Sequence, residues 1–224
     1  KSILTEFIKG NGNDLKGRPY DLLGLIAFSR FPDTICPLTF SHESLCRLIE
    51  TIEINDTPKE DGTAYGDAIA LAAAKLESLG KKDTVHQKYK VKNKVIVLLT
   101  DGENNSGRHL PENAAELAKQ WGIRIYSISI ADDSWKSQDS GKIEYSEAEI
   151  ILQKVSEASG GFFKKVSDYD SLKVIYSEID QLEKSKIVEI PHIEYLELFK
   201  YFCYASIFCL LLAHLLKSTI FRHT

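Results

Sequence analysis

Two oxygen-bearing residues stand at positions where α/β proteins bind ligands. Asp101 closely follows residues 95–99, the most hydrophobic run of the chain, and Thr63 lies in a polar turn before an Ala-rich helical segment. In a parallel α/β sheet, ligands bind at the carboxyl ends of the strands. A carboxylate and a hydroxyl are hard oxygen ligands that suit Mg²⁺, which is octahedral at ~2.1 Å. The alternative is that Thr63 caps its helix and Asp101 stabilises a turn, the usual roles of these residue types.

Other catalytic signatures are missing from the sequence. It contains no Gly-Lys-Ser/Thr phosphate loop, no His-Glu-x-x-His and no Cys-x-x-Cys, and residues 10–15 have Leu15 where a dinucleotide loop needs its third glycine. The serines in predicted strands have no paired histidine to activate them. What remains is the pair of oxygen-bearing residues, and the sequence indicates no small-molecule substrate.

The elements that must position Thr63 and Asp101 follow from periodicity. Buried-strand runs alternate with segments whose apolar residues recur at helical spacing. This alternation predicts a mainly parallel, doubly wound α/β sheet with helices on both faces. Strands are predicted at 20–29, 35–40, 95–99, 123–130 and 162–166, and helices at 41–54, 66–79, 111–121, 150–158 and 171–187. Pro37 confines the second strand to an edge or a strand end.

Composition places the chain among ordinary globular proteins. Its 224 residues include 28 Lys+Arg and 32 Asp+Glu, a net charge of −4, and 43% are hydrophobic. A slightly acidic chain without basic runs argues against nucleic acid as a partner. The chain has no Met and opens inside an amphipathic pattern at residues 1–8, which favours N-terminal truncation.

The C-terminal segment changes character. Residues 201–216 form an uncharged run of 16 residues, without Asp, Glu, Lys or Arg, between Lys200 and Lys217. A membrane span needs ~20 residues. Leu198-Phe199 and the two flanking lysines, whose side chains can extend to the membrane surface, would supply the missing length. We therefore predict a transmembrane helix; the alternatives are a buried helix or an amphipathic helix lying on the bilayer. The predicted domains are 1–187 for the α/β domain, 188–197 for a linker, 198–217 for the membrane helix and 218–224 for a tail.

Several motifs together resemble the von Willebrand factor type A (vWA) domain, and within it the bacterial membrane-anchored BatA/BatB (Bat aerotolerance) group. The resemblance rests on two motifs in register and on further segments over nearly the whole chain: residues 61–69, 95–107, 114–118, 122–128, 159–163 and 175–184. It implies a vWA/Rossmann-like fold. In the family the first, central strand lies upstream of a helix whose last part matches residues 1–9, so we expect this chain to lack that strand.

The resemblance also implies a metal-ion-dependent adhesion site (MIDAS). In that site an Asp-x-Ser-x-Ser turn, a threonine and an aspartate hold Mg²⁺, or Mn²⁺ or Ca²⁺. Thr63 and Asp101 match the last two positions, whereas the sequence has no Asp-x-Ser-x-Ser. The expected site is therefore incomplete.

By this resemblance the protein is a membrane-anchored, non-enzymatic interaction module that binds partners through the metal. The implied partners are other Bat-type subunits and a MoxR-like AAA+ ATPase, in envelope stress or assembly. Localisation is expected at the bacterial inner membrane. The short basic tail after the span favours the cytoplasmic side, which would put the vWA domain in the periplasm. Two alternatives stay open: a scaffold that binds without metal, and a Mg²⁺-dependent hydrolase using Asp101.

Overall fold

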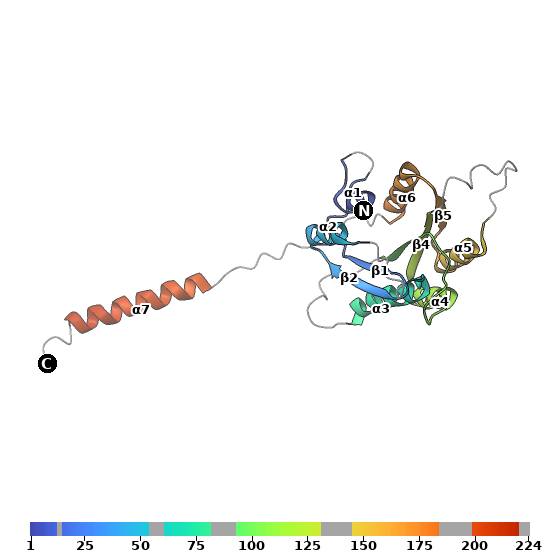
Figure 1. The fold of residues 1–224 in the computed structure, drawn as a ribbon. Helices are drawn as coiled ribbons and strands as arrows, with labels where there is room; N and C mark the ends of the chain where they lie inside the picture. Colours follow the sequence, from blue (N-terminus) through green and yellow to red (C-terminus); the bar gives the residue numbers. More distant parts are fainter. Residues whose placement is uncertain (13–14, 54–60, 82–92, 131–144, 184–198, 220–224) are drawn as a thin grey trace. The chain divides into compact units, whose positions relative to one another are not determined.

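Helices and strands alternate from residue 65 to residue 182 in the computed structural model, which describes residues 1–12, 15–53, 61–81, 93–130, 145–183 and 199–219. Contacts divide the chain into two units, Lys1–Lys186 and Ile187–Thr224. The second unit contains α7 (Phe199–Thr219). The first unit contains, in order, α1 (Ser2–Lys9), β1 (Leu23–Phe28), β2 (Pro32–Thr39), α2 (His42–Thr51), α3 (Tyr65–Lys81), β3 (Lys94–Thr100), α4 (Pro111–Gln120), β4 (Ile123–Ile130), α5 (Glu147–Ser159), β5 (Phe163–Val166) and α6 (Tyr169–Leu182) (Figure 1).

The described strands form two sheets. β3, β4 and β5 are parallel neighbours in that order, and β1 pairs with β2 in antiparallel orientation. Only residues 29–31 separate β1 from β2, which allows a hairpin but not a crossover. Among the described strands, β1 and β3 each pair along one side only. The expectation that a first strand is lacking stays a prediction.

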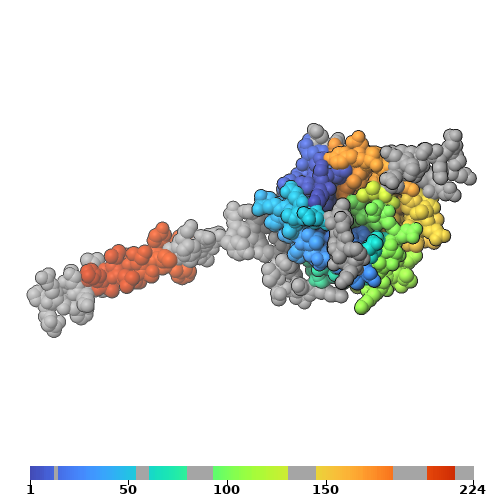
Figure 2. All heavy atoms as spheres, in the orientation of Figure 1, coloured from blue at the N-terminus to red at the C-terminus, as the bar shows by residue number. Residues whose placement is uncertain are grey.

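Helices cover both faces of the parallel sheet, as predicted. Tyr65 and Ile69 of α3 pack in one core cluster with Ile96 and Leu98 of β3, joined by α4 and α5. A second cluster joins α1 and α6 to the opposite face. Figure 2 shows α4 (green) and α5 (yellow) side by side on the surface of this unit, and the two helices are in contact. The doubly wound α/β architecture is therefore confirmed.

The predicted transmembrane helix at 198–217 is wrong. Within the ranges that the structure describes, no helix is long and apolar enough to cross a membrane. The uncharged run of 16 residues is short against the ~20 that a span requires. Tyr201, Tyr204 and His214 also interrupt its apolar character, and the prediction relied on flanking residues for the missing length.

Candidate functional site

Thr63 and Asp101 lie on two loops that meet at one edge of the parallel sheet. Asp101 directly follows β3, and Thr63 precedes the first residue of α3, Tyr65. The backbone amides of Asn105 and Ser106 donate hydrogen bonds to the Thr63 carbonyl oxygen, at 3.1 and 3.2 Å. The structure therefore joins the loops of both predicted site residues.

Two glycines show how closely the loops approach. A Cβ atom added at Gly102 would lie 3.4 Å from Thr63 Oγ1, so the Thr63 hydroxyl lies beside the residue that follows Asp101. A Cβ atom added at Gly66 would lie 2.2 Å from the carbonyl oxygen of His109. Because such a contact is far inside van der Waals distance, only glycine fits at Gly66 without moving the backbone.

The side chains of Asn104 and Asn105 add bonds that the sequence interpretation missed. Asn105 Oδ1 accepts a hydrogen bond from the Thr63 amide at 2.8 Å, and Asn104 Oδ1 accepts one from the Gly66 amide at 2.9 Å. Both asparagines belong to the motif after β3, but the motif does not reveal their role because their partners stand 42 and 38 residues earlier.

Asp67, in the first turn of α3, contacts the far end of the loop after β3. Its carboxylate accepts bonds from the amides of Arg108 and His109, and from His109 Nδ1 at 2.6 Å. Burial raises the pKa of the Asp67 carboxyl, but these hydrogen bonds outweigh burial and hold that pKa below its usual value. The ionised form of Asp67 is therefore favoured.

A cavity of about 450 Å³ opens beside Asp101. It lies where the carboxyl ends of β3 and β4 meet the start of α5, and its lining comprises Asp101, Gly102, Glu103, Ser129, Ile130, Ser146, Ala148, Glu149 and Leu152. Asp101 and Glu103 are exposed, whereas Glu149 is buried and forms an ion pair with Lys165 at 2.8 Å. Asp101 is thus accessible to a ligand at the rim of a mostly polar hollow.

The donor set fits a hard divalent cation in chemistry but not in number. The Thr63 hydroxyl and the Asp101 carboxylate are oxygen donors of the kind that Mg²⁺ prefers. Across the described residues, no group of three or more His, Cys, Asp or Glu side chains could hold a metal ion. Two protein oxygens leave four positions of an octahedron for water or for other ligands.

Comparison with known proteins relates this chain to one domain family. The sequence profile of the von Willebrand factor type A domain matches residues 2–178. An uncharacterized protein of Borreliella burgdorferi is 27% identical in an alignment that is 233 residues long and covers 99% of this chain. The chain spans 62% of the length of that relative.

Solved structures share the fold at low sequence identity. BatB from Bacteroides thetaiotaomicron is 23% identical with a TM-score of 0.57, covering 82% of this chain and 86% of BatB. An aerotolerance-related membrane protein from Bacteroides fragilis is 21% identical with a TM-score of 0.56, covering 79% and 84%. Proximal thread matrix protein 1 from the mussel byssus, with a zinc-occupied MIDAS motif, is 18% identical with a TM-score of 0.54, covering 80% and 41%.

The profile match agrees with the doubly wound sheet and with the positions of the two loops that meet at its edge. The match extends from α1 into α6, and it includes the Thr63 turn and the loop after β3. The chain belongs to the von Willebrand factor type A family.

Proposed function

We propose that this protein is a non-enzymatic interaction module that binds protein partners through a divalent cation held by Thr63 and Asp101. The observation that carries the proposal is the hydrogen-bonded junction that puts the Thr63 hydroxyl beside the residue after Asp101. Two further facts support it. vWA domains generally mediate protein interactions, and the fold neighbour from mussel byssus has a zinc-occupied MIDAS motif.

Each side chain has a separate task in this proposal. Asp101 supplies negative charge at an exposed position, and Thr63 supplies a neutral oxygen from the start of α3. A bound Mg²⁺, Mn²⁺ or Ca²⁺ would keep an open position for a carboxylate of the partner. The hollow beside Asp101 leaves room for the partner's neighbouring side chains.

We also propose that the partners are other Bat-type subunits and a MoxR-like AAA+ ATPase, acting in envelope stress or in protein assembly. The fold neighbours BatB and the aerotolerance-related membrane protein support this assignment. By the same comparison, the protein works in association with a membrane. In this assignment the interaction module comprises residues 1–187.

The metal proposal is tested by calorimetric titration of the full chain with Mn²⁺. Asp101→Ala and Thr63→Ala should each weaken Mn²⁺ binding at least ~10-fold, the effect of losing ~1.4 kcal/mol of ligand energy. Glu103→Gln is the matched control, because it removes one exposed negative charge from the same loop without removing a proposed ligand. Wild-type protein that releases no binding heat, or Asp101→Ala protein that binds Mn²⁺ like wild type, would refute the proposal.

Partner capture separates the module from a scaffold that binds without metal. Immobilised full chain should retain a purified Bat-type subunit in Mg²⁺ and release it in EDTA, and Asp101→Ala protein should fail to retain it. Equal capture in Mg²⁺ and EDTA by both proteins would establish the metal-independent alternative.

A further inference from the structure

The start of α3 receives its cap from a distant loop. The first amides of a helix have no intrahelical acceptor and are usually capped by the residue just before the helix. Here that residue is Ala64, which has no side-chain acceptor. The Gly66 amide instead donates to Asn104 Oδ1, and the Thr63 amide donates to Asn105 Oδ1. The loop after β3 therefore caps the helix that follows Thr63.

Further bonds run in the opposite direction. Asp67, on α3, accepts from the amides of Arg108 and His109 at 3.0 and 2.7 Å, and 15% of its side chain is exposed. Gly107 has a φ of 98°, which is the left-handed region that glycine adopts readily, and it lets the chain turn onto the Asp67 carboxylate. The acceptors on the two elements thus bind backbone donors of one another.

We propose that Asn104, Asn105 and Asp67 are positioning residues that form a loop clasp, which sets the distance between Thr63 and Asp101 before any ligand binds. This inference rests on the proposed function for its consequence at the metal. All three acceptors bind backbone amides, so the clasp fixes the paths of the two loops rather than the rotamers of single side chains. Partners that orient metal ligands typically change metal affinity ~10–100-fold when they are removed.

A purely structural role is the competing explanation. In that case the hydrogen bonds of these three acceptors fasten α3 to the loop after β3 and add stability, with no specific effect on the site. Stability alone does not separate the two explanations, because the loss of a typical hydrogen bond costs about 1 kcal/mol wherever the bond lies. A control that loses an equivalent bond far from the site is therefore needed.

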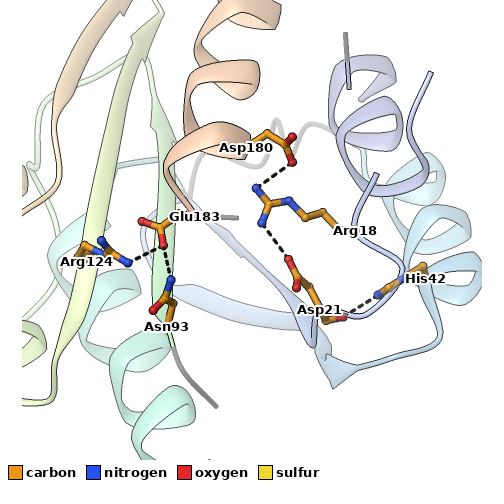
Figure 3. A network of polar contacts seen from close by, with 7 residues as sticks. All are labelled: Arg18, Asp21, His42, Asn93, Arg124, Asp180 and Glu183. Atoms are coloured by element: carbon orange, nitrogen blue, oxygen red, sulfur yellow. Dashed lines mark hydrogen bonds and ion pairs between the residues drawn. The ribbon is translucent and has the colours of Figure 1, made fainter. Parts of the chain in front are cut away.

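Asn93 provides that control. It precedes β3 at the other end of the strand, and its Nδ2 donates to Glu183 Oε2 at 3.1 Å (Figure 3). Asn93→Ala removes the bond to Glu183, and Asn105→Ala removes the bond from the Thr63 amide together with one from the neighbouring Ser106 hydroxyl. Only the second variant loosens the proposed clasp. Asn105→Asp keeps an acceptor oxygen for the Thr63 amide and serves as the conservative variant.

The experiment measures Mn²⁺ binding and metal-free amide exchange on the full chain. Asn105→Ala should weaken Mn²⁺ binding ~10–100-fold and speed exchange at the Thr63 amide at least ~10-fold. Asn93→Ala should change neither quantity more than ~3-fold, and Asn105→Asp should restore protection of the Thr63 amide. Asn104→Ala should likewise speed exchange at the Gly66 amide.

Two results would overturn the clasp: unchanged exchange at Thr63 and Gly66 in the alanine variants, or equal losses of Mn²⁺ affinity in Asn105→Ala and Asn93→Ala. Failure of the wild-type chain to bind Mn²⁺ would instead refute the proposed function. The exchange measurement, made without metal, would then still decide whether the clasp holds the loops.

Discussion

The buried carboxylate of Glu183 lies at the centre of a polar network (Figure 3). Two of its partners, Asn93 and Arg124, lie at the starts of β3 and β4, whereas the candidate site lies where these strands end. The Glu183 side chain is 4% exposed, and Oε2 contacts Arg124 Nη2 at 2.6 Å and Asn93 Nδ2 at 3.1 Å. The hydroxyl of Tyr126, a residue that is 2% exposed, donates to the other carboxylate oxygen. We predict that Glu183→Ala destabilises the protein by about 3 kcal/mol.

The magnitude follows from what each partner loses. Tyr126 is left with a buried hydroxyl without an acceptor, which costs about 1–3 kcal/mol. The Arg124 side chain is 36% exposed and can bind water instead, so its loss is at most about 1 kcal/mol. Glu183→Gln keeps one acceptor oxygen and the shape of the side chain, so it should cost only about 1 kcal/mol.

Urea unfolding of the full chain measures these differences. With a slope of about 2 kcal/mol/M, Glu183→Ala should lower the midpoint by about 1.5 M. Tyr126→Phe removes the hydroxyl that Glu183→Ala would leave unpaired. The double variant should therefore be more stable than the sum of the single effects predicts, by about 1–2 kcal/mol. A midpoint shift below ~0.5 M, or strict additivity, would refute this account of the network.

The same network predicts a spectroscopic change. Burial first, and then the hydrogen bond and charge of Glu183, raise the pKa of Tyr126 to about 12. Glu183→Gln removes the charge but not the burial. The pKa of Tyr126, followed by ultraviolet absorbance, should therefore fall but stay above its ordinary value.

Three further predictions test other parts of the molecule. Asp67→Asn should destabilise the protein at pH 7, and its difference from wild type should shrink below about pH 4, because a carboxyl with a lowered pKa loses its contribution as pH falls; a constant difference in urea titrations would contradict this. Burial raises the pKa of Tyr176 to about 12, so wild type should lose stability as pH rises above about 10. In thermal melts, the melting temperature of Tyr176→Phe should fall less than that of wild type over the same rise in pH. Gly161→Ala would place a Cβ 2.0 Å from the carbonyl oxygen of Ile125 and should cost about 2–3 kcal/mol, whereas Gly160→Ala, with no atom within 4 Å of the new Cβ, should cost about 1 kcal/mol in urea titrations.

Local signals were sufficient for most elements of the fold. The aliphatic run predicted at 95–99 is the core of β3, and Pro111 with Gly122 bracketed the observed α4 within one residue. These elements were predictable because their start, stop and burial signals lie within the segment itself. β2 begins at Pro32 rather than at the predicted residue 35, because pairing of Phe28 with Pro32 extends the strand.

Long-range polar contacts were not predictable in the same way. Asn105 is in a recognised motif, yet its partner amide is 42 residues earlier in the chain. The Glu183 network likewise joins the end of α6 to β4 across 57 and 59 residues. A polar residue in a loop has the same sequence signature whether it binds water or a distant amide, so composition and periodicity do not distinguish the two cases.

The meeting of the loops that carry Thr63 and Asp101 follows from the lengths of the elements between them. α3 has 17 residues and β3 has 7, which correspond to about 25 Å of helix and about 23 Å of strand. The helix and strand pack against one another, and the hydrogen bonds between their loops put the start of the helix beside the end of the strand. Because the two lengths match, a strand that runs back along the helix ends beside the residues where the helix began. The oxygen donors of the candidate site are thus brought to one edge by apolar packing, and the polar clasp needs only to set their final separation.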